Sequence, residues 1–190
     1  QNDEVLHVQD GDLTLINTTF TDNTTGPSAV INFHPHARDD GNHIFHNVVM
    51  AENVTDENCD LYVRNAVNVS ATGSYSDDSS CDFASNGGTD DAYVSVGALM
   101  TAANGTQFHS VSGDPFEGGD SSLLPTEDDL GIDVDQDGII ETTTITIDQR
   151  EETRIVGTMV DAGAVEIACA DYDALLSGAG YVVGSFKPDL

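Results

Sequence analysis

Leu13-Thr-Leu-Ile-Asn17-Thr-Thr-Phe20-Thr-Asp-Asn23 is followed 30 residues later by a similar segment, His43-Ile-Phe-His-Asn47-Val-Val-Met50-Ala-Glu-Asn53. Apolar and polar residues alternate with period two in both copies, as in a strand, and the alternation breaks at Asn17 and Asn47. A short polar side chain tolerates a left-handed corner there, so the pattern predicts strand-turn-strand units. Because such units bury an apolar face only by stacking on neighbours, the repeat predicts a solenoid.

Short strands are expected throughout residues 1–83, separated by turn-forming clusters of Asn, Asp, Gly and Pro. They are expected at Val5–Val8, Leu13–Ile16, Ala29–Phe33, Ile44–Met50, Leu61–Val63 and Val67–Val69. The pattern loosens over 84–130 and returns to alternation over 139–160. The helical candidate is Asp171–Leu176. We therefore expect solenoid turns over 1–83, a closing region over 84–170 and a tail over 171–190.

The charge balance limits the possible partners. The 190 residues include 34 acidic and 5 basic side chains, a formal net charge of -29. Nucleic acid is therefore excluded as a partner, and anionic membranes or polyuronates would be repelled unless a divalent cation bridged them. With 38% hydrophobic residues the chain is expected to fold, and no apolar run approaches the ~18 residues of a membrane-spanning helix.

Cysteines and glycosylation sequons both point to an exported protein. Cys59 and Cys81 flank a Gly-, Ser- and Asp-rich segment, and a bridge between them would stabilise the fold by ~3 kcal/mol. The alternative is two buried thiols. Cys169 is either buried, or linked to a cysteine outside this chain. Sequons occur at Asn17, Asn23, Asn53, Asn68 and Asn104, although some arise by chance in so polar a chain.

Two later segments carry a family resemblance. Gly113-Asp-Pro-Phe-Glu-Gly-Gly-Asp120-Ser-Ser-Leu-Leu-Pro125 is similar to a family pattern G-S-P-A-I-D-A-G-D followed by Leu-Pro. Arg154-Ile-Val-Gly-Thr-Met-Val-Asp161-Ala-Gly-Ala-Val-Glu166 is similar to R-x-x-G-G-x-V-D-I-G-A-Y-E. The chain thus resembles the C-terminal part of secreted proteins of the pectate-lyase-like superfamily, many of them attached to cell surfaces. It departs from the pattern at Phe116-Glu-Gly, Ala162 and Val165.

The resemblance implies an all-β fold, a right-handed parallel β-helix with long Asp/Gly-rich loops and a short C-terminal tail. It also implies a recurrent cysteine pair at the spacing of Cys59 and Cys81. It does not fix the function, because this family contains lyases, hydrolases, tailspikes, adhesins and stalks alike.

Catalytic groups are hard to find in the sequence. A polyuronate lyase needs a cationic side chain in a groove, and the arginines number four: Arg38, Arg64, Arg150 and Arg154. A hydrolase needs two carboxylates ~5 to ~9.5 Å apart across a cleft. The Asp-Asp pairs at 39/40, 77/78, 90/91 and 128/129 are typical of solvated turns.

The most specific chemical motif is an acidic loop. It runs Asp133-Val-Asp135-Gln-Asp137-Gly138-Ile139-Ile140-Glu141. Its carboxylates, the carbonyl of Ile139 and a glycine that allows a sharp turn match the ligand spacing of calcium loops, so we expect Ca2+ to bind there. Position twelve is Thr144, unlike a complete EF-hand, and the alternative is an acidic turn without an ion.

A histidine cluster offers a second candidate metal site. His34, His36, His43 and His46 could supply nitrogen ligands to a transition metal, and His34 and His36 share a face if extended. A turn at 39–42 separates the two pairs, which favours ordinary hydrogen bonding by histidines in solenoid turns.

Two classes of function follow. The favoured one is a non-catalytic, extracellular structural or adhesive protein that contacts its own copies, other surface proteins or glycans. The other is a carbohydrate-active enzyme or glycan-binding module. An uncovered first turn would serve as a template for head-to-tail association into a filament. If the chain continues upstream of Gln1, further turns would cover that edge instead.

Overall fold

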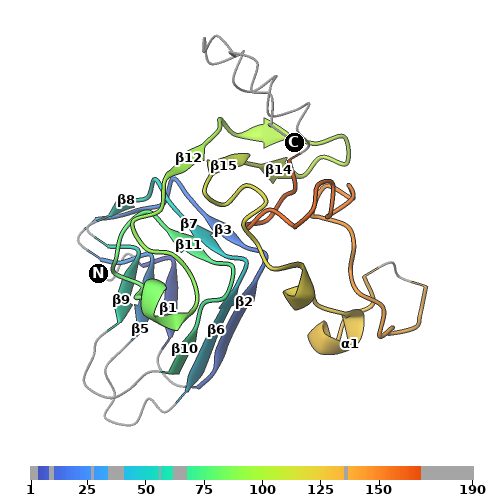
Figure 1. The fold of residues 1–190 in the computed structure, drawn as a ribbon, viewed down its shortest axis with the longest axis horizontal. Coiled ribbons are helices and arrows are strands. Elements are labelled where there is room, and N and C mark those ends of the chain that lie inside the picture. Colours follow the sequence, from blue (N-terminus) through green and yellow to red (C-terminus); the bar gives the residue numbers. More distant parts are fainter. Residues whose placement is uncertain are drawn as a thin grey trace.

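The first half of the chain forms parallel strands stacked in register. The computed structural model describes residues 4–8, 11–26, 28–33, 41–55, 57–61, 68–134 and 137–167 (Figure 1). The strands of this half are β1 (Leu6–Val8), β2 (Leu13–Ile16), β3 (Thr19–Phe20), β4 (Thr24–Gly26), β5 (Ile31–Phe33), β6 (Asn42–His46), β7 (Val49–Met50), β8 (Val54–Thr55), β9 (Cys59–Leu61), β10 (Asn68–Ser70) and β11 (Tyr75–Ser76).

Strand order shows three successive passes of the chain, which we call rungs: residues 6–26, 31–55 and 59–76. The sheets β1-β5-β9, β2-β6-β10 and β3-β7-β11 each take one strand from every rung, and β4 pairs with β8. All these pairings are parallel. The molecule is therefore mostly β, with an architecture compatible with a β-helix.

The 30-residue repeat is confirmed as the register between the first two rungs. Leu15 pairs with Phe45, and Phe20 pairs with Met50. Asn17 and Asn47 have φ angles of 50° and 54°, so both occupy the predicted left-handed corner. The third rung follows at a shorter offset, since Tyr75 pairs with Val49.

A narrow apolar core lies between the three sheets. Phe33, Phe45 and Met50 are almost fully buried in it. At the third rung Phe83 closes the core, with its ring centroid 5.2 Å from that of Phe45. It precedes the short 3-10 helix η1 (Ala84–Asn86), and the adjoining backbone bonds to the third rung through Ser76 N and Thr89 O at 2.9 Å.

The two ends of the stack therefore differ. Residues 77–92 cover the third rung, whereas β1, β2, β3 and β4 each have a sheet neighbour on one side only within the described part of the chain. The first rung thus presents an open strand edge among the residues that the structure describes.

Antiparallel pairs follow the stack. β12 (Val94–Val96) pairs with β15 (Val111–Gly113), and β13 (Met100–Thr101) pairs with β14 (Gln107–Phe108). The amide of Val96 donates to Glu52 Oε1 at 2.9 Å, which fastens this unit to the second rung. The next elements are a 3-10 helix η2 (Ser121–Leu123) and the helix α1 (Glu127–Leu130).

The alternation over 139–160 does not coincide with named strands among the described residues. The described residues 137–167 contain isolated bridges, such as Ile147 with Thr153, but no named strand. Ile139 and Val156 are 60% and 51% exposed, so this alternation has no apolar layer to pack against. The helical candidate at 171–176 lies outside the described residues.

Candidate functional site

One buried asparagine joins the stack to the closing region. The Oδ1 atom of Asn47 accepts a hydrogen bond from the backbone amide of Asp120 at 2.7 Å. Its Nδ2 group donates to the carbonyl of Asp120 and to Asn17 Oδ1, both at 3.1 Å. The backbone carbonyl of Asn47 also accepts from Gly163 N at 2.8 Å. Both polar groups of the Asn47 side chain thus form hydrogen bonds, one set to Asn17 in the first rung and the other to Asp120 in the segment 113–125.

The same corner in the third rung has a glycine for a steric reason. Gly73 has a φ of 68° and follows Asn47 at the 26-residue offset of that rung. A Cβ atom at this position would lie 2.4 Å from Asn47 Oδ1 and 2.9 Å from Asp120 N. The asparagine ladder therefore stops at two rungs, since the closing region occupies the place of a third side chain.

A second ladder of amides crosses all three rungs. Asn23 Nδ2 donates to Asn53 Oδ1 at 2.9 Å, and Asn53 Nδ2 donates to Asn58 Oδ1 at 2.9 Å. Asn58 in turn donates to Asp77 Oδ1 at 2.7 Å and to Ser76 Oγ at 3.0 Å. Asn23 and Asn53 are predictable as repeat positions, whereas Asn58 lies outside the repeat and has no such signal.

The predicted disulfide between Cys59 and Cys81 is present, with its Cα atoms 4.9 Å apart. Both cysteines are buried, and Met50 Sδ lies 3.6 Å from Cys81 Sγ. The bridge fixes the segment that covers the third rung to β9. Cys169 lies outside the described residues.

The second family-like segment forms a buried charged cluster. Arg154 is 1% exposed and donates to the carbonyl of Gly163. Asp161 accepts from the amides of Glu117 at 2.6 Å and Ile167 at 2.8 Å. Glu166 accepts from Asp161 N at 2.9 Å, so the carboxylates hold the backbone of the closing turn in place.

A second arginine completes this cluster. Arg150 forms an ion pair with Asp148 at 2.6 Å, and its guanidinium lies 5.0 Å from the centroid of the Phe108 ring. Both described arginines therefore serve the closing region. Arg38, Arg64 and Lys187 lie outside the described residues.

Burial decides the protonation behaviour of this cluster. Desolvation raises the pKa of Asp161 to about 6, against the opposing effect of its backbone hydrogen bonds. Desolvation likewise raises the pKa of Glu166 and lowers the pKa of Arg154. We therefore expect the stability of the closing turn to depend on pH through Asp161.

The acidic loop is folded around its own carboxylates. Asp133 Oδ2 accepts from Gly138 N at 2.7 Å, and Asp137 Oδ1 accepts from Ile139 N at 2.8 Å. Asp135 lies outside the described residues. Among the described residues no group of three or more His, Cys, Asp or Glu side chains has an arrangement that could hold a metal ion.

Glu127 in α1 holds both ends of this loop. Its Oε1 atom accepts from Val134 N at 2.6 Å, and its Oε2 atom accepts from Glu141 N at 3.0 Å. Glu127 is 5% exposed. Helix α1 was not predicted from the sequence, although Thr126 and Asp129 form a capping box that marks its start.

Two of the four candidate histidines, His43 and His46, lie within the described residues. His43 points into the core, with its ring centroid 4.5 Å from that of Phe33. His46 is half-buried at the opposite end of β6, and burial lowers its pKa more than nearby Asp120 raises it. His34 and His36 lie outside the described residues.

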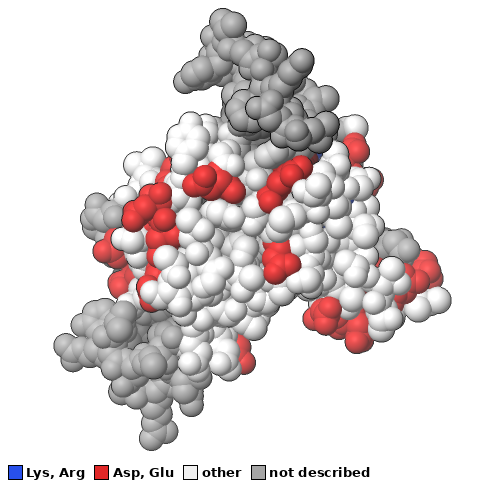
Figure 2. All heavy atoms as spheres, viewed as in Figure 1, with Lys and Arg blue, Asp and Glu red and all other residues white. Residues whose placement is uncertain are grey.

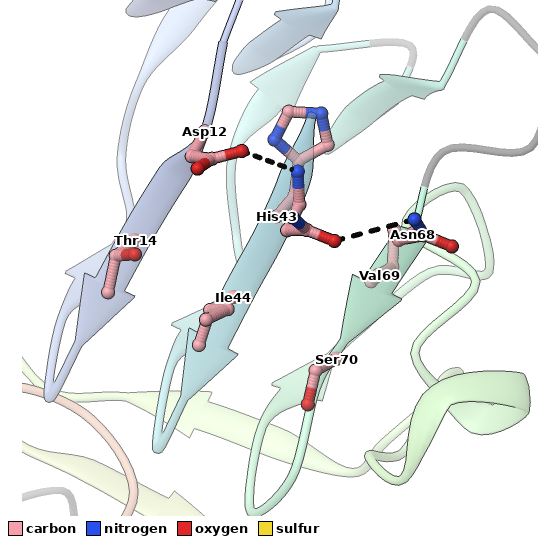
Figure 3. Close-up of a pocket in the computed structure, with 8 residues that line it drawn as sticks. Asp12, Thr14, His43, Ile44, Asn68, Val69 and Ser70 are labelled. Carbon is pink, nitrogen blue, oxygen red and sulfur yellow. Dashed lines mark hydrogen bonds between the residues drawn. The ribbon is translucent and has the colours of Figure 1, made fainter. Parts of the chain in front are cut away.

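A shallow groove of about 400 Å³ lies on the outer face of the β2-β6-β10 sheet (Figure 3). Thr14, Ile44 and Ser70 form one row across its floor, one residue from each rung. The next row begins with Asp12, whose Oδ1 atom accepts from Asn42 N at 2.8 Å. The groove thus offers hydroxyl, amide and carboxylate groups around the apolar side chain of Ile44.

Comparison with protein-family models, with curated proteins and with solved structures gives no significant match. The family resemblance consequently rests on the two closing segments, the cysteine pair and the stacked parallel strands.

The surface charge agrees with the composition. Figure 2 shows acidic side chains spread over the visible face rather than gathered in one patch. Within the described ranges, no helix is long and apolar enough to cross a membrane.

Proposed function

We propose that the protein is a non-catalytic, extracellular structural or adhesive protein built on a right-handed parallel β-helix. The observation that carries this proposal is the pair of asparagine ladders, which link the rungs through buried or half-buried side chains. Such ladders, together with the Cys59–Cys81 bridge, are suited to holding a narrow stack rigid without a large core.

Calcium is the proposed stabilising ion. Asp133, Asp135, Asp137 and Glu141 would supply carboxylate oxygens, and Ile139 would supply its carbonyl oxygen. The hydrogen bonds that Glu127 accepts from the amides of Val134 and Glu141 support a structural role, because an ion bound in this loop would fasten α1 and the closing region together. The proposed affinity is that of extracellular modules, on the order of 10⁻⁴ to 10⁻³ M.

Self-association is proposed through the open edge of the first rung. Head-to-tail growth of a filament would require the segment 77–92 to move away from the third rung, since Phe83 and the disulfide hold it there. Two first-rung edges could pair with each other without that rearrangement, in a contact that closes on itself. Other surface proteins and glycans are further proposed partners.

The alternative is a carbohydrate-active enzyme or glycan-binding module. The groove over Thr14, Ile44 and Ser70 favours it, because hydroxyls and amides around a small apolar floor are groups that recognise sugars. Arg150 and Arg154 bind within the closing cluster, so neither serves an anionic sugar in that groove.

Incubation of the purified chain with neutral polysaccharides and polyuronates, with and without calcium, tests the choice. We expect no new reducing ends and no unsaturated products. Turnover that Thr14→Ala or Ser70→Ala abolishes without loss of thermal stability would favour the enzyme. Immunogold labelling of intact cells from the natural source should mark the surface.

A further inference from the structure

The five sequons differ in how their side-chain amides are used. Attachment of a glycan replaces one of the two hydrogens on Asn Nδ2, so a side chain that donates both is unsuited to modification. Asn23 donates both, to Thr21 O at 3.2 Å and to Asn53 Oδ1 at 2.9 Å. Asn53 also donates both, to Phe20 O at 3.1 Å and to Asn58 Oδ1 at 2.9 Å. A glycan on either would remove one of these hydrogen bonds.

Two other sequons lie on the stack itself. Asn17 is half-buried in the left-handed corner, where its Oδ1 atom accepts from Asn47. Asn68 is exposed but belongs to β10, and its Nδ2 group donates to Asn42 Oδ1 at 3.4 Å. Asn17 therefore lies at a corner of the stack and Asn68 lies in a sheet, whereas glycan acceptors are expected in surface loops.

Asn104 lies in a surface loop, at the tip of the hairpin between β13 and β14. It is exposed, as are its neighbours Ala103 and Gly105, and a Cβ atom at Gly105 would meet nothing within 4 Å. Its Oδ1 atom accepts from Thr106 N at 3.0 Å, which brings together the first and third residues of the sequon.

The amide of Asn104 also keeps one hydrogen available. Its Nδ2 group donates one bond, to Gln149 O at 3.3 Å, whereas Asn23 and Asn53 each donate two. The loop has room for a substituent on the remaining position. Modification there would break no contact between rungs.

We propose that Asn104 carries an N-linked glycan, while Asn23 and Asn53 remain unmodified. A bond forms between Asn104 Nδ2 and the anomeric carbon of a sugar donated by a lipid-linked glycosyl phosphate. The bond from that carbon to the phosphate oxygen breaks, its electron pair leaves with the lipid phosphate, and the transferase base takes the Nδ2 proton. The assignment rests on the proposed extracellular location, but not on calcium binding or self-association.

The test uses the full chain fused to an export signal in an N-glycosylating host, with glycopeptide mass spectrometry of the secreted protein. The variants are Asn104→Gln and Thr106→Ala, which destroy the sequon, and Thr106→Ser, which preserves it. We expect the glycan at Asn104 in the parent and in Thr106→Ser, its complete loss in the other two, and unmodified peptides around Asn23 and Asn53. An unmodified Asn104 in the secreted chain, or a glycan at Asn23 or Asn53, overturns the proposal.

The secreted variants also allow the glycosylation proposal and the proposed structural function to be tested independently. Native mass and calcium-dependent melting are measured on the Thr106→Ala chain, which lacks the glycan. Because neither property depends on Asn104, they report on the structural function whichever residue is modified.

Discussion

Asn47 and Asp120 are joined by two hydrogen bonds, from Asp120 N to Asn47 Oδ1 at 2.7 Å and from Asn47 Nδ2 to Asp120 O at 3.1 Å. These residues are 73 positions apart in the chain. The buried side-chain amide of Asn47 thus links Asp120 in the closing region to the corner of the stack.

Asn47→Gly is expected to lower the free energy of unfolding by about 2–4 kcal/mol. Glycine accepts the left-handed backbone at this corner, so the loss reports on the side-chain hydrogen bonds rather than on strain. Asn17→Gly is the matched control at the equivalent corner of the first rung, where one such bond is shown, and should cost about 1 kcal/mol. Chemical denaturation measures both. Equal losses in the two variants would argue against a special role of the contact with Asp120.

Gly73→Ala is expected to destabilise the fold by at least about 2 kcal/mol more than Gly105→Ala. Both glycines have positive φ angles, so both variants carry the cost of a left-handed alanine. The new Cβ at position 73 would overlap Asn47 Oδ1 and Asp120 N, whereas the one at position 105 is in open space. Thermal melting of the pair checks this. Similar melting temperatures would show that the corner accommodates a third side chain.

Calcium at 10 mM should raise the free energy of unfolding by about 1–3 kcal/mol over that in excess chelator, given the affinity proposed above. Asp135→Ala should remove this difference. Asp128→Asn is the control, because Asp128 is an exposed carboxylate of α1 outside the loop. Identical melting curves in calcium and chelator for the unmodified chain would identify the loop as an acidic turn.

Acidification from pH 7 to pH 5 should raise the free energy of unfolding of the natural sequence relative to that of Asp161→Asn. Burial raises the pKa of Asp161 from 3.8 to about 6, so the folded state binds this proton more tightly than the unfolded state. The contribution of the protonated Asp161 to the stability of the folded state is fully present below pH 3.8 and is lost as the pH rises through 6. Burial lowers the pKa of His46, so acidification destabilises the folded state through this residue. This effect is the same in both chains and cancels when their stabilities are compared. Melting temperatures at half-unit pH steps measure the difference. Parallel curves for the two chains would contradict the assignment.

The sequence predicted the first two rungs well because their corners repeat the same residue type. Asn17 and Asn47 take the same backbone conformation, and the strands between corners follow at a fixed spacing. The third rung does not continue the 30-residue repeat, since its offset from the second rung is shorter and Gly73 replaces the corner asparagine to make room for Asp120. The register of the third rung thus depends on a contact that is distant in sequence.

The closing region was predicted less well, and the reason is physical. Ile139, Ile147 and Val156 suggest strands by their alternation, yet each is more than a third exposed and belongs to no named strand. Order in this segment comes from backbone amides that donate hydrogen bonds to carboxylates. Examples are the amide of Val134, which donates to Glu127, and the amide of Glu117, which donates to Asp161. Periodicity does not report contacts of this kind. The disulfide was predictable because Cys59 and Cys81 flank a segment rich in Gly, Ser and Asp.

Size-exclusion chromatography with multi-angle light scattering, followed by negative-stain imaging of the same fractions in calcium and physiological salt, tests the central claim most directly. The proposed structural protein should elute at a multiple of the 20.0 kDa chain mass and appear as paired or elongated particles. A monodisperse 20.0 kDa species under these conditions would contradict self-association through the first-rung edge.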